Sequence, residues 1–174
     1  MAKSLLLSSF ILLCSAIIES SILSNISFLY VVPDLVLICS IYFSLLNGKT
    51  VGVSTGFLSG LFLDFITGIP FGFNCIIRTI LGYAYGFFSE TLIVTGFIMP
   101  MFTVGAGTII KKLLTYIVSI LFPNVNIFNP SIISYAFLFE FVINILLAPA
   151  IFKFLGLFRN TLTIYTTKDK MNNV

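Results

Sequence analysis

The chain alternates long apolar stretches with short polar interruptions, a pattern that predicts helices crossing a membrane. About six stretches are expected as membrane-spanning helices, over residues 4–23, 33–47, 51–68, 71–88, 97–121 and 131–152. Turn residues such as Asn47-Gly48 and Gly68-Ile69-Pro70 separate them. We therefore predict an all-α polytopic membrane protein: about six transmembrane helices in one bundle, with no second soluble domain.

Some limits of these spans have alternatives. The first stretch can also be interpreted as a signal peptide with a small-residue cleavage site at Ser15-Ala16, but the apolar run continues past that site and favours a retained span. The span over residues 33–47 is short, so either it extends back through residues 25–32 or that segment enters the membrane as non-helical chain covered by protein. Residues 91–122 are too long for one crossing, and Pro100 and Gly105-Ala106-Gly107 are the residues that can break them.

The basic residues of the loops and ends all fall on one side of a six-span arrangement. This is the positive-inside pattern, and it predicts that both termini are cytoplasmic. Residues 153–174 are then a basic cytoplasmic tail, whereas five spans would place that tail outside. The residues concerned are Lys3, Lys49, Lys153, Arg159, Lys168 and Lys170.

Composition supports a membrane protein and disfavours several other classes. Hydrophobic residues make up 59% of the 174 residues and charged residues 9%, and the mean hydropathy is +1.15. A net charge of +3 in so apolar a chain does not indicate a nucleic-acid partner. Without histidine, closely spaced cysteines or a catalytic motif, the sequence indicates no metal, no cofactor and no enzyme.

A series of small residues at every fourth position is the most regular feature of the sequence. It consists of Gly52, Gly56, Gly60, Asp64, Gly68 and Gly72. In a helix these positions form a slowly winding smooth groove, which lets another helix backbone approach closely. We therefore expect the helix over residues 51–68 to be the central packing element, with Gly82 and Gly86 adding a second small-residue pair for packing.

Asp64 and Arg78 lie at similar depths on either side of the turn at Gly68-Ile69-Pro70. An unpaired charge near the membrane centre costs about 2.5 to 3.5 kcal/mol on the insertion scale. We hypothesise that Asp64 and Arg78 pair inside the bundle, and favour a structural role over substrate chemistry. Glu19, in the first span, is expected to be neutral or hydrogen-bonded inside the bundle rather than part of a proton relay.

Lys112 and Glu140 form the second hypothesised pair, between the fifth and sixth spans. Both lie about ten residues from the predicted outer face, which places them at similar depth. Lys111 is the alternative donor, and in a further alternative both lysines extend to the outer headgroups and pair with nothing.

The motifs of residues 32–86 resemble those of the rod shape-determining protein MreD family. They are V-P-D-L-V-L-I with Pro33 and Asp34, the glycine series from Gly52 to Gly72, and L-G-Y-A-Y-G at residues 81–86. Chain length and hydropathy are also similar to that family, whereas the C-terminal half is similar in hydropathy alone. The resemblance implies a fold similar to the substrate-binding subunits of energy-coupling-factor transporters.

The resemblance also implies a function. It indicates a non-enzymatic membrane scaffold of the bacterial cell-elongation complex in the inner membrane, in contact with lipid. Its implied partners are a bitopic MreC-like protein, the MreB filament and the RodA/penicillin-binding-protein peptidoglycan synthase. The alternative is a substrate-binding subunit of a vitamin-type transporter. The first span favours the scaffold, because Ala16 is the only alanine in its interior and no A-x-x-x-A docking motif is present.

Overall fold

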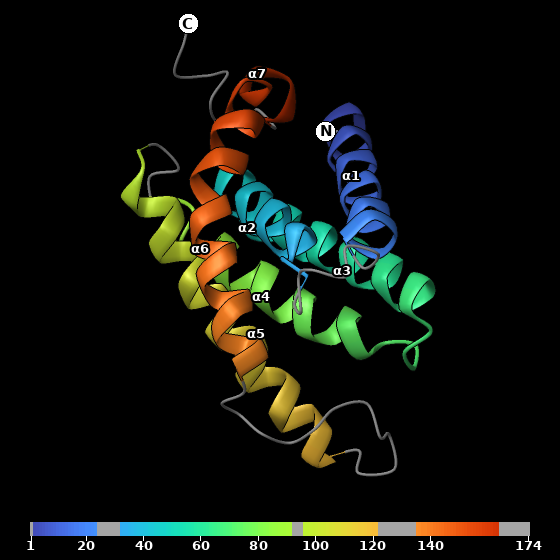
Figure 1. The fold of residues 1–174 in the computed structure, drawn as a ribbon. Coiled ribbons are helices and arrows are strands. Elements are labelled where there is room, and N and C mark those ends of the chain that lie inside the picture. The colour runs from blue at the N-terminus through green and yellow to red at the C-terminus, as the bar shows by residue number, and fades with distance from the viewer. Residues whose placement is uncertain (1, 24–31, 92–95, 122–134, 164–174) are drawn as a thin grey trace, which may run out of the picture.

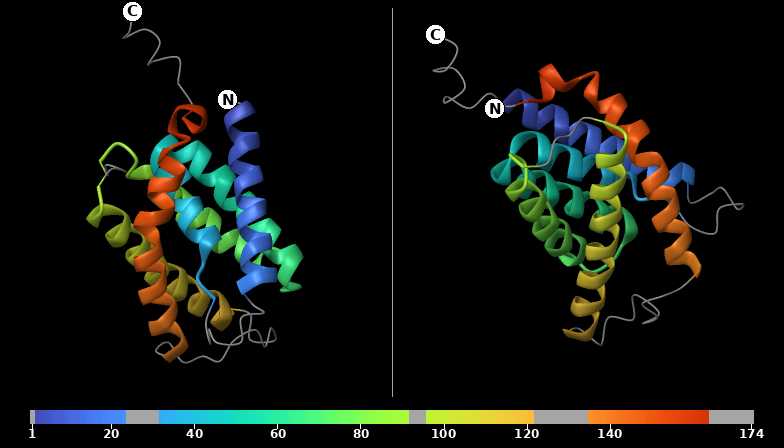
Figure 2. Two further views of the ribbon diagram at one scale, coloured as in Figure 1. Left: turned by 45° about the horizontal axis from the view of Figure 1, so that its top comes forward. Right: turned by 90° about the vertical axis from the view of Figure 1, so that its left-hand side faces the viewer.

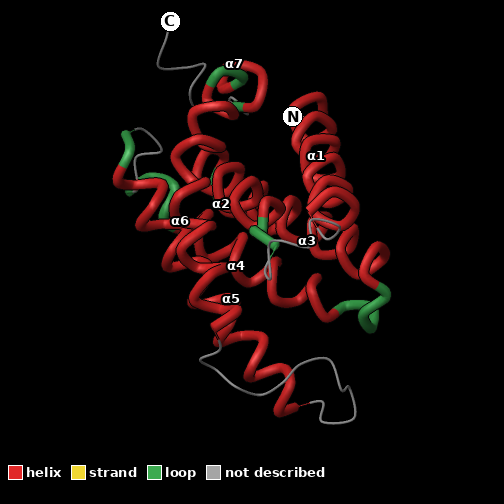
Figure 3. Tube along the Cα trace, viewed as in Figure 1, coloured by secondary structure: helices red, strands yellow, loops and turns green. Residues whose placement is uncertain are grey.

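A computed structural model describes residues 2–23, 32–91, 96–121 and 135–163 of the chain. These residues form helices joined by short connections, and none of them lies in a strand (Figure 3). The elements are α1 (Ala2–Ile17), the π-helical turn η1 (Ile18–Leu23), α2 (Leu35–Asn47), α3 (Lys49–Thr67), α4 (Phe73–Phe87), α5 (Ile98–Leu121), α6 (Tyr135–Gly156) and α7 (Arg159–Leu162).

Four helical segments of the described chain are long and apolar enough to cross a membrane. They are Ser4–Ser21, Lys49–Thr67, Ile98–Ile120 and Tyr135–Gly156. With 13 residues in α2 and 15 in α4, these two helices reach only about 20 Å, less than a hydrocarbon core of about 30 Å. The all-helical membrane architecture is thus confirmed, and the count of about six spans stays a prediction. Pro100 does not break α5, because it lies in the first turn, where proline is tolerated.

α2 is the helix that the others surround. It packs against α1, α3, α4, α5 and α6, and its residues 36–45 are all buried. A helix that is apolar on every side can face lipid or lie inside a bundle, and the burial of residues 36–45 places α2 inside the bundle. The expectation that the glycine-rich helix is the central element is therefore wrong, since α2 holds that position and α3 lies at its side (Figure 1).

α3 and α4 form an antiparallel hairpin in which the two backbones touch. An ideal Cβ added at Gly52 would lie 2.2 Å from the carbonyl oxygen of Gly82, and one at Gly56 would lie 2.3 Å from that of Arg78. At Gly60 it would lie 2.5 Å from the backbone nitrogen of Cys75. Because real Cβ atoms do not approach so closely, only glycine permits this packing.

Gly86 also packs against backbone, whereas Gly68 and Gly72 serve the turn between the hairpin helices. A Cβ at Gly86 would lie 2.6 Å from Cα of Lys49. Gly68 and Gly72 have φ angles of 67° and 97°, and a Cβ at either would meet no atom within 4 Å. The series from Gly52 to Gly72 therefore has two roles, and the packing role expected for its last two glycines is wrong.

The end of the described chain is part of the folded core. α6 continues past residue 152 to Gly156, and α7 follows and packs against α1. Leu155 and Leu162 have exposed fractions of 1% and 0%. Two residues of the expected tail over residues 153–174 are thus buried in the bundle, and the limits of that tail stay a prediction. Lys168 and Lys170 lie outside the described residues.

We predict that Gly52→Ala lowers the free energy of unfolding in detergent by about 3 kcal/mol, because neither backbone can yield to the new methyl group. Gly156→Ala is the control, since its Cβ would meet no atom within 4 Å and should change stability by less than about 1 kcal/mol. Thermal unfolding of the purified variants measures both. Equal melting temperatures for the two variants would contradict the backbone contact.

Candidate functional site

The candidate site is a buried ionic cluster built around Asp34, the residue that begins α2. The Asp34 side chain caps the helix, because its Oδ1 accepts a hydrogen bond of 2.7 Å from the backbone N–H of Leu37. The backbone N–H of Asp34 itself donates to Oδ1 of Asn144 in α6, at 2.9 Å. These two bonds fix the carboxylate at one end of the central helix.

Two cations from different helices converge on this carboxylate. Nη2 of Arg78, in α4, lies 2.8 Å and 2.9 Å from the two oxygens of Asp34, and both side chains are 4% exposed. Nζ of Lys111, in α5, lies 2.8 Å from Oδ2 of Asp34 and also forms an ion pair with Glu140 of α6. Charge-assisted bonds of this kind are about twice as strong as neutral ones.

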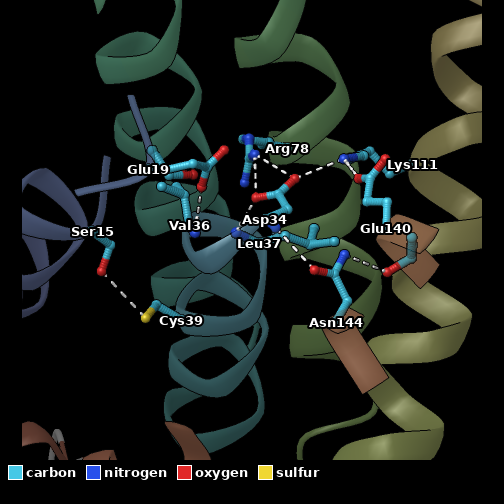
Figure 4. A network of polar contacts seen from close by, with 12 residues as sticks. Ser15, Glu19, Asp34, Val36, Leu37, Cys39, Arg78, Lys111, Glu140 and Asn144 are labelled. Carbon is cyan, nitrogen blue, oxygen red and sulfur yellow. Dashed lines mark hydrogen bonds and ion pairs between the residues drawn. The ribbon is translucent and has the colours of Figure 1, made fainter. Parts of the chain in front are cut away.

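The cluster therefore links four helices through side chains that are distant in the sequence (Figure 4). Asn144 extends it, since its Nδ2 donates to Oγ1 of Thr108 in α5 at 3.3 Å. Asn144 and Thr108 are both fully buried. α5 and α6 are therefore joined at two depths of the bundle, by the ion pair of Lys111 and Glu140 and by the hydrogen bond of Thr108 and Asn144.

Glu19 approaches the cluster from the other side. Its Oε2 accepts a hydrogen bond of 3.2 Å from the backbone N–H of Val36, in the first turn of α2. Its carboxyl group points toward Arg78 (Figure 4), whose Nε and Nη1 are buried and have no hydrogen-bond partner in the described part of the chain. Glu19 is thus hydrogen-bonded inside the bundle, and the pairing of Arg78 is concentrated on its Nη2 group.

The expected pair of Asp64 and Arg78 is not formed. The Asp64 carboxylate is 1% exposed and accepts hydrogen bonds from the backbone N–H groups of Gly72, Asn74 and Cys75, at 2.9, 3.0 and 3.4 Å. These N–H groups lie at the start of α4, where a carboxylate is stabilised by unpaired donors and the helix dipole. Asp64 is satisfied at the turn, so Arg78 pairs with Asp34 instead.

The expected pair of Lys112 and Glu140 is also not formed, and the alternative donor Lys111 takes its place. Successive residues of a helix point about 100° apart, so only one of two adjacent lysines can face Glu140. Nζ of Lys112 lies 5.6 Å from the ring centroid of Phe137, a cation–π distance. The prediction of a Lys–Glu pair between α5 and α6 had the correct helices and the wrong lysine.

The sequence interpretation missed Asp34 as an ionic partner, together with Asn144 and Thr108. Asp34 was identified only as part of the Pro33-Asp34 motif. Two cations within apolar spans, Arg78 and Lys111, were the signal that more than one buried carboxylate was needed. A count of intramembrane charges could have found Asp34, whereas nothing in the sequence marks Asn144 as its partner.

The geometry defines a class of protein: an all-helical membrane protein whose interior charges join its helices to one another. The family model for rod shape-determining protein MreD matches residues 2–158, and the chain belongs to that family. Comparisons with curated proteins and with solved structures gave no match. Family membership supports a role in rod cell shape and, with the four apolar helices, indicates an inner-membrane protein.

We predict that Asp34→Asn lowers the free energy of unfolding by about 3–5 kcal/mol, because it leaves Arg78 and Lys111 buried with too little negative charge. The asparagine can still cap α2, so the loss reports on charge. Glu90→Gln removes the same charge at an exposed position and should change stability by less than about 0.5 kcal/mol. Thermal unfolding in detergent measures both, and equal stability of the two variants would contradict the assignment.

We further predict that Lys111→Gln costs about 2 kcal/mol or more, whereas Lys112→Gln costs less than about 0.5 kcal/mol. The first variant removes the cation that Asp34 and Glu140 share. The second removes a lysine for which the structure gives a ring contact. The same unfolding assay distinguishes the two variants. A larger loss of stability for Lys112→Gln would support the pair of Lys112 and Glu140 and contradict the assignment to Lys111.

Proposed function

We propose that this protein is a non-enzymatic integral membrane scaffold of the bacterial cell-elongation complex. In that role it binds an MreC-like bitopic protein and helps couple MreB filaments to peptidoglycan synthesis by the RodA/penicillin-binding-protein synthase. The observation that carries the proposal is the family match over residues 2–158, which includes every described helix except the short α7.

The use of the interior charges supports a scaffold over the alternative, a substrate-binding subunit of a vitamin-type transporter. A binding subunit that used these interior charges for its substrate would need them to converge on an open pocket. Here Asp34 and Arg78 are 4% exposed and bind each other, while Lys111 joins Asp34 to Glu140. These groups hold helices together, and their hydrogen-bonding capacity is directed mainly to one another.

The outer surface suits contact with lipid and with helices of partner proteins. α5 and α6 run along one side of the bundle (Figure 2), and large apolar side chains on them remain exposed, such as Phe102 at 69% and Phe139 at 63%. Exposed apolar surface of this kind is stable against lipid tails or against another apolar helix. Binding of a bitopic partner therefore requires no rearrangement of the core.

The arrangement of the ends supports the proposed orientation, with both termini in the cytoplasm. α7, which contains Arg159, packs against α1, and the N-terminal end of α1 lies beside it (Figure 1). Lys153 precedes α7 in the last turn of α6. Basic residues thus gather at the end of the bundle where the chain begins, as the positive-inside rule requires of a cytoplasmic face.

The test is purification of the tagged full-length protein from its native membranes in mild detergent, followed by mass spectrometry of the proteins that co-purify. We expect an MreC-like bitopic protein with components of the peptidoglycan synthase. A polytopic membrane protein with the same tag, expressed at the same level, is the control for non-specific capture. Recovery of a transporter coupling subunit with paired ATPases would overturn the proposal.

A further inference from the structure

A cavity of about 590 Å³ lies away from the ionic cluster, between the second half of α6, α2 and the start of α5. Its volume is within the range of about 300–1,000 Å³ that is usual for small-molecule pockets. Lys153 and Arg159 line it together with Tyr42, and apolar residues such as Phe97, Leu146 and Pro149 supply the remaining wall. The charged lining residues are both basic, so the cavity favours an anion.

Tyr42 places a polar group in this cavity. The residue is 1% exposed, and its ring is held edge-on by Phe43 and Phe152, with centroid distances of 5.9 and 5.2 Å. Arg159 lines the same cavity as Tyr42. Because Tyr42 lines the cavity, its hydroxyl is available to donate a hydrogen bond to a ligand there.

The apolar part of the lining is open to the surroundings. Phe97 and Leu146 are 70% and 63% exposed, so they present apolar surface next to the basic residues. Free phosphate gains no binding energy from apolar surface, whereas an amphiphile covers that surface with its hydrocarbon chains. The lining therefore matches a molecule with an anionic head and an apolar tail.

The position of the cavity agrees with that chemistry. Lys153 and Arg159 lie at the end of the bundle proposed to be cytoplasmic, and the cytoplasmic leaflet carries anionic lipids that attract basic residues. We propose that this cavity binds the headgroup of an anionic phospholipid. The phosphate lies between Lys153 and Arg159, the Tyr42 hydroxyl donates a hydrogen bond to it, and the acyl chains lie along Phe97 and Leu146.

This inference does not depend on the proposed partners. A shape-determining scaffold that binds no MreC-like protein could still bind the lipid, and a scaffold with all its partners could lack the site. The two proposals are therefore tested by separate experiments and fail separately.

The experiment is lipid titration of the delipidated full-length protein in detergent, with phosphatidylglycerol and phosphatidylcholine compared by thermal shift and native mass spectrometry. We expect phosphatidylglycerol to bind more tightly. Removing both cations, in Lys153→Gln with Arg159→Gln, should lower this preference about 25-fold, or about fivefold for each charge. Tyr42→Phe should lower phosphatidylglycerol affinity about tenfold through loss of a hydrogen bond to a charged group.

Lys49→Gln is the matched control. It removes a lysine that is predicted on the same side of the membrane but does not line the cavity, and lies 4.3 Å from the ring centroid of Phe87. This variant should keep the full preference, and melting temperatures without lipid verify that all variants fold. Equal binding of the two lipids, or an unchanged preference in the double variant, would overturn the proposal. Equal stabilisation by inorganic phosphate alone would assign the site to a free anion and overturn the lipid.

Discussion

One carboxylate, that of Asp34, neutralises cations from two other helices, and the packing around α2 depends on it. A charge inside a membrane protein is tolerated when it is paired and hydrogen-bonded by other protein groups. Asp34 meets this condition because its own backbone and side chain are bound to α2 and α6. The cluster that results specifies which helices are neighbours. Apolar contacts alone specify this only weakly in a bilayer, because lipid tails solvate an apolar helix equally well.

The hairpin of α3 and α4 is held by a different interaction. There the glycines remove side chains from the interface, and the two backbones make direct van der Waals contact over about three turns. Such contact is rigid, because backbone atoms cannot rotate away as a side chain can. Arg78 takes part in both the glycine packing and the ionic cluster. Its carbonyl oxygen lies against Gly56, and its guanidinium group binds Asp34. The position of this cation in the bundle is therefore fixed by the glycine packing.

Sequence reasoning predicted the helices well and the ionic partners poorly, for a physical reason. Hydropathy and turn residues determine where a helix begins and ends, and α5 differs from its expected range by one residue at its start. Depth along a helix could also be estimated, but two charges at equal depth pair only if they face each other. Asp64 faces the start of its own hairpin partner, and Lys112 points away from the residue that Lys111 reaches. The facing direction depends on tertiary packing, as does the central position of α2.

The contact between α1 and α7 determines when the fold can be completed. These are the first and last helices described, so α1 enters the membrane long before α7 is synthesised. Until then the buried face of α1 contacts only some of the helices that it packs against in the complete fold. Arg78 of α4 and Lys111 of α5 also enter the bundle one after the other as their helices are synthesised. Closure of the first helix against the last described one is therefore a late step, because it cannot precede the synthesis of α7.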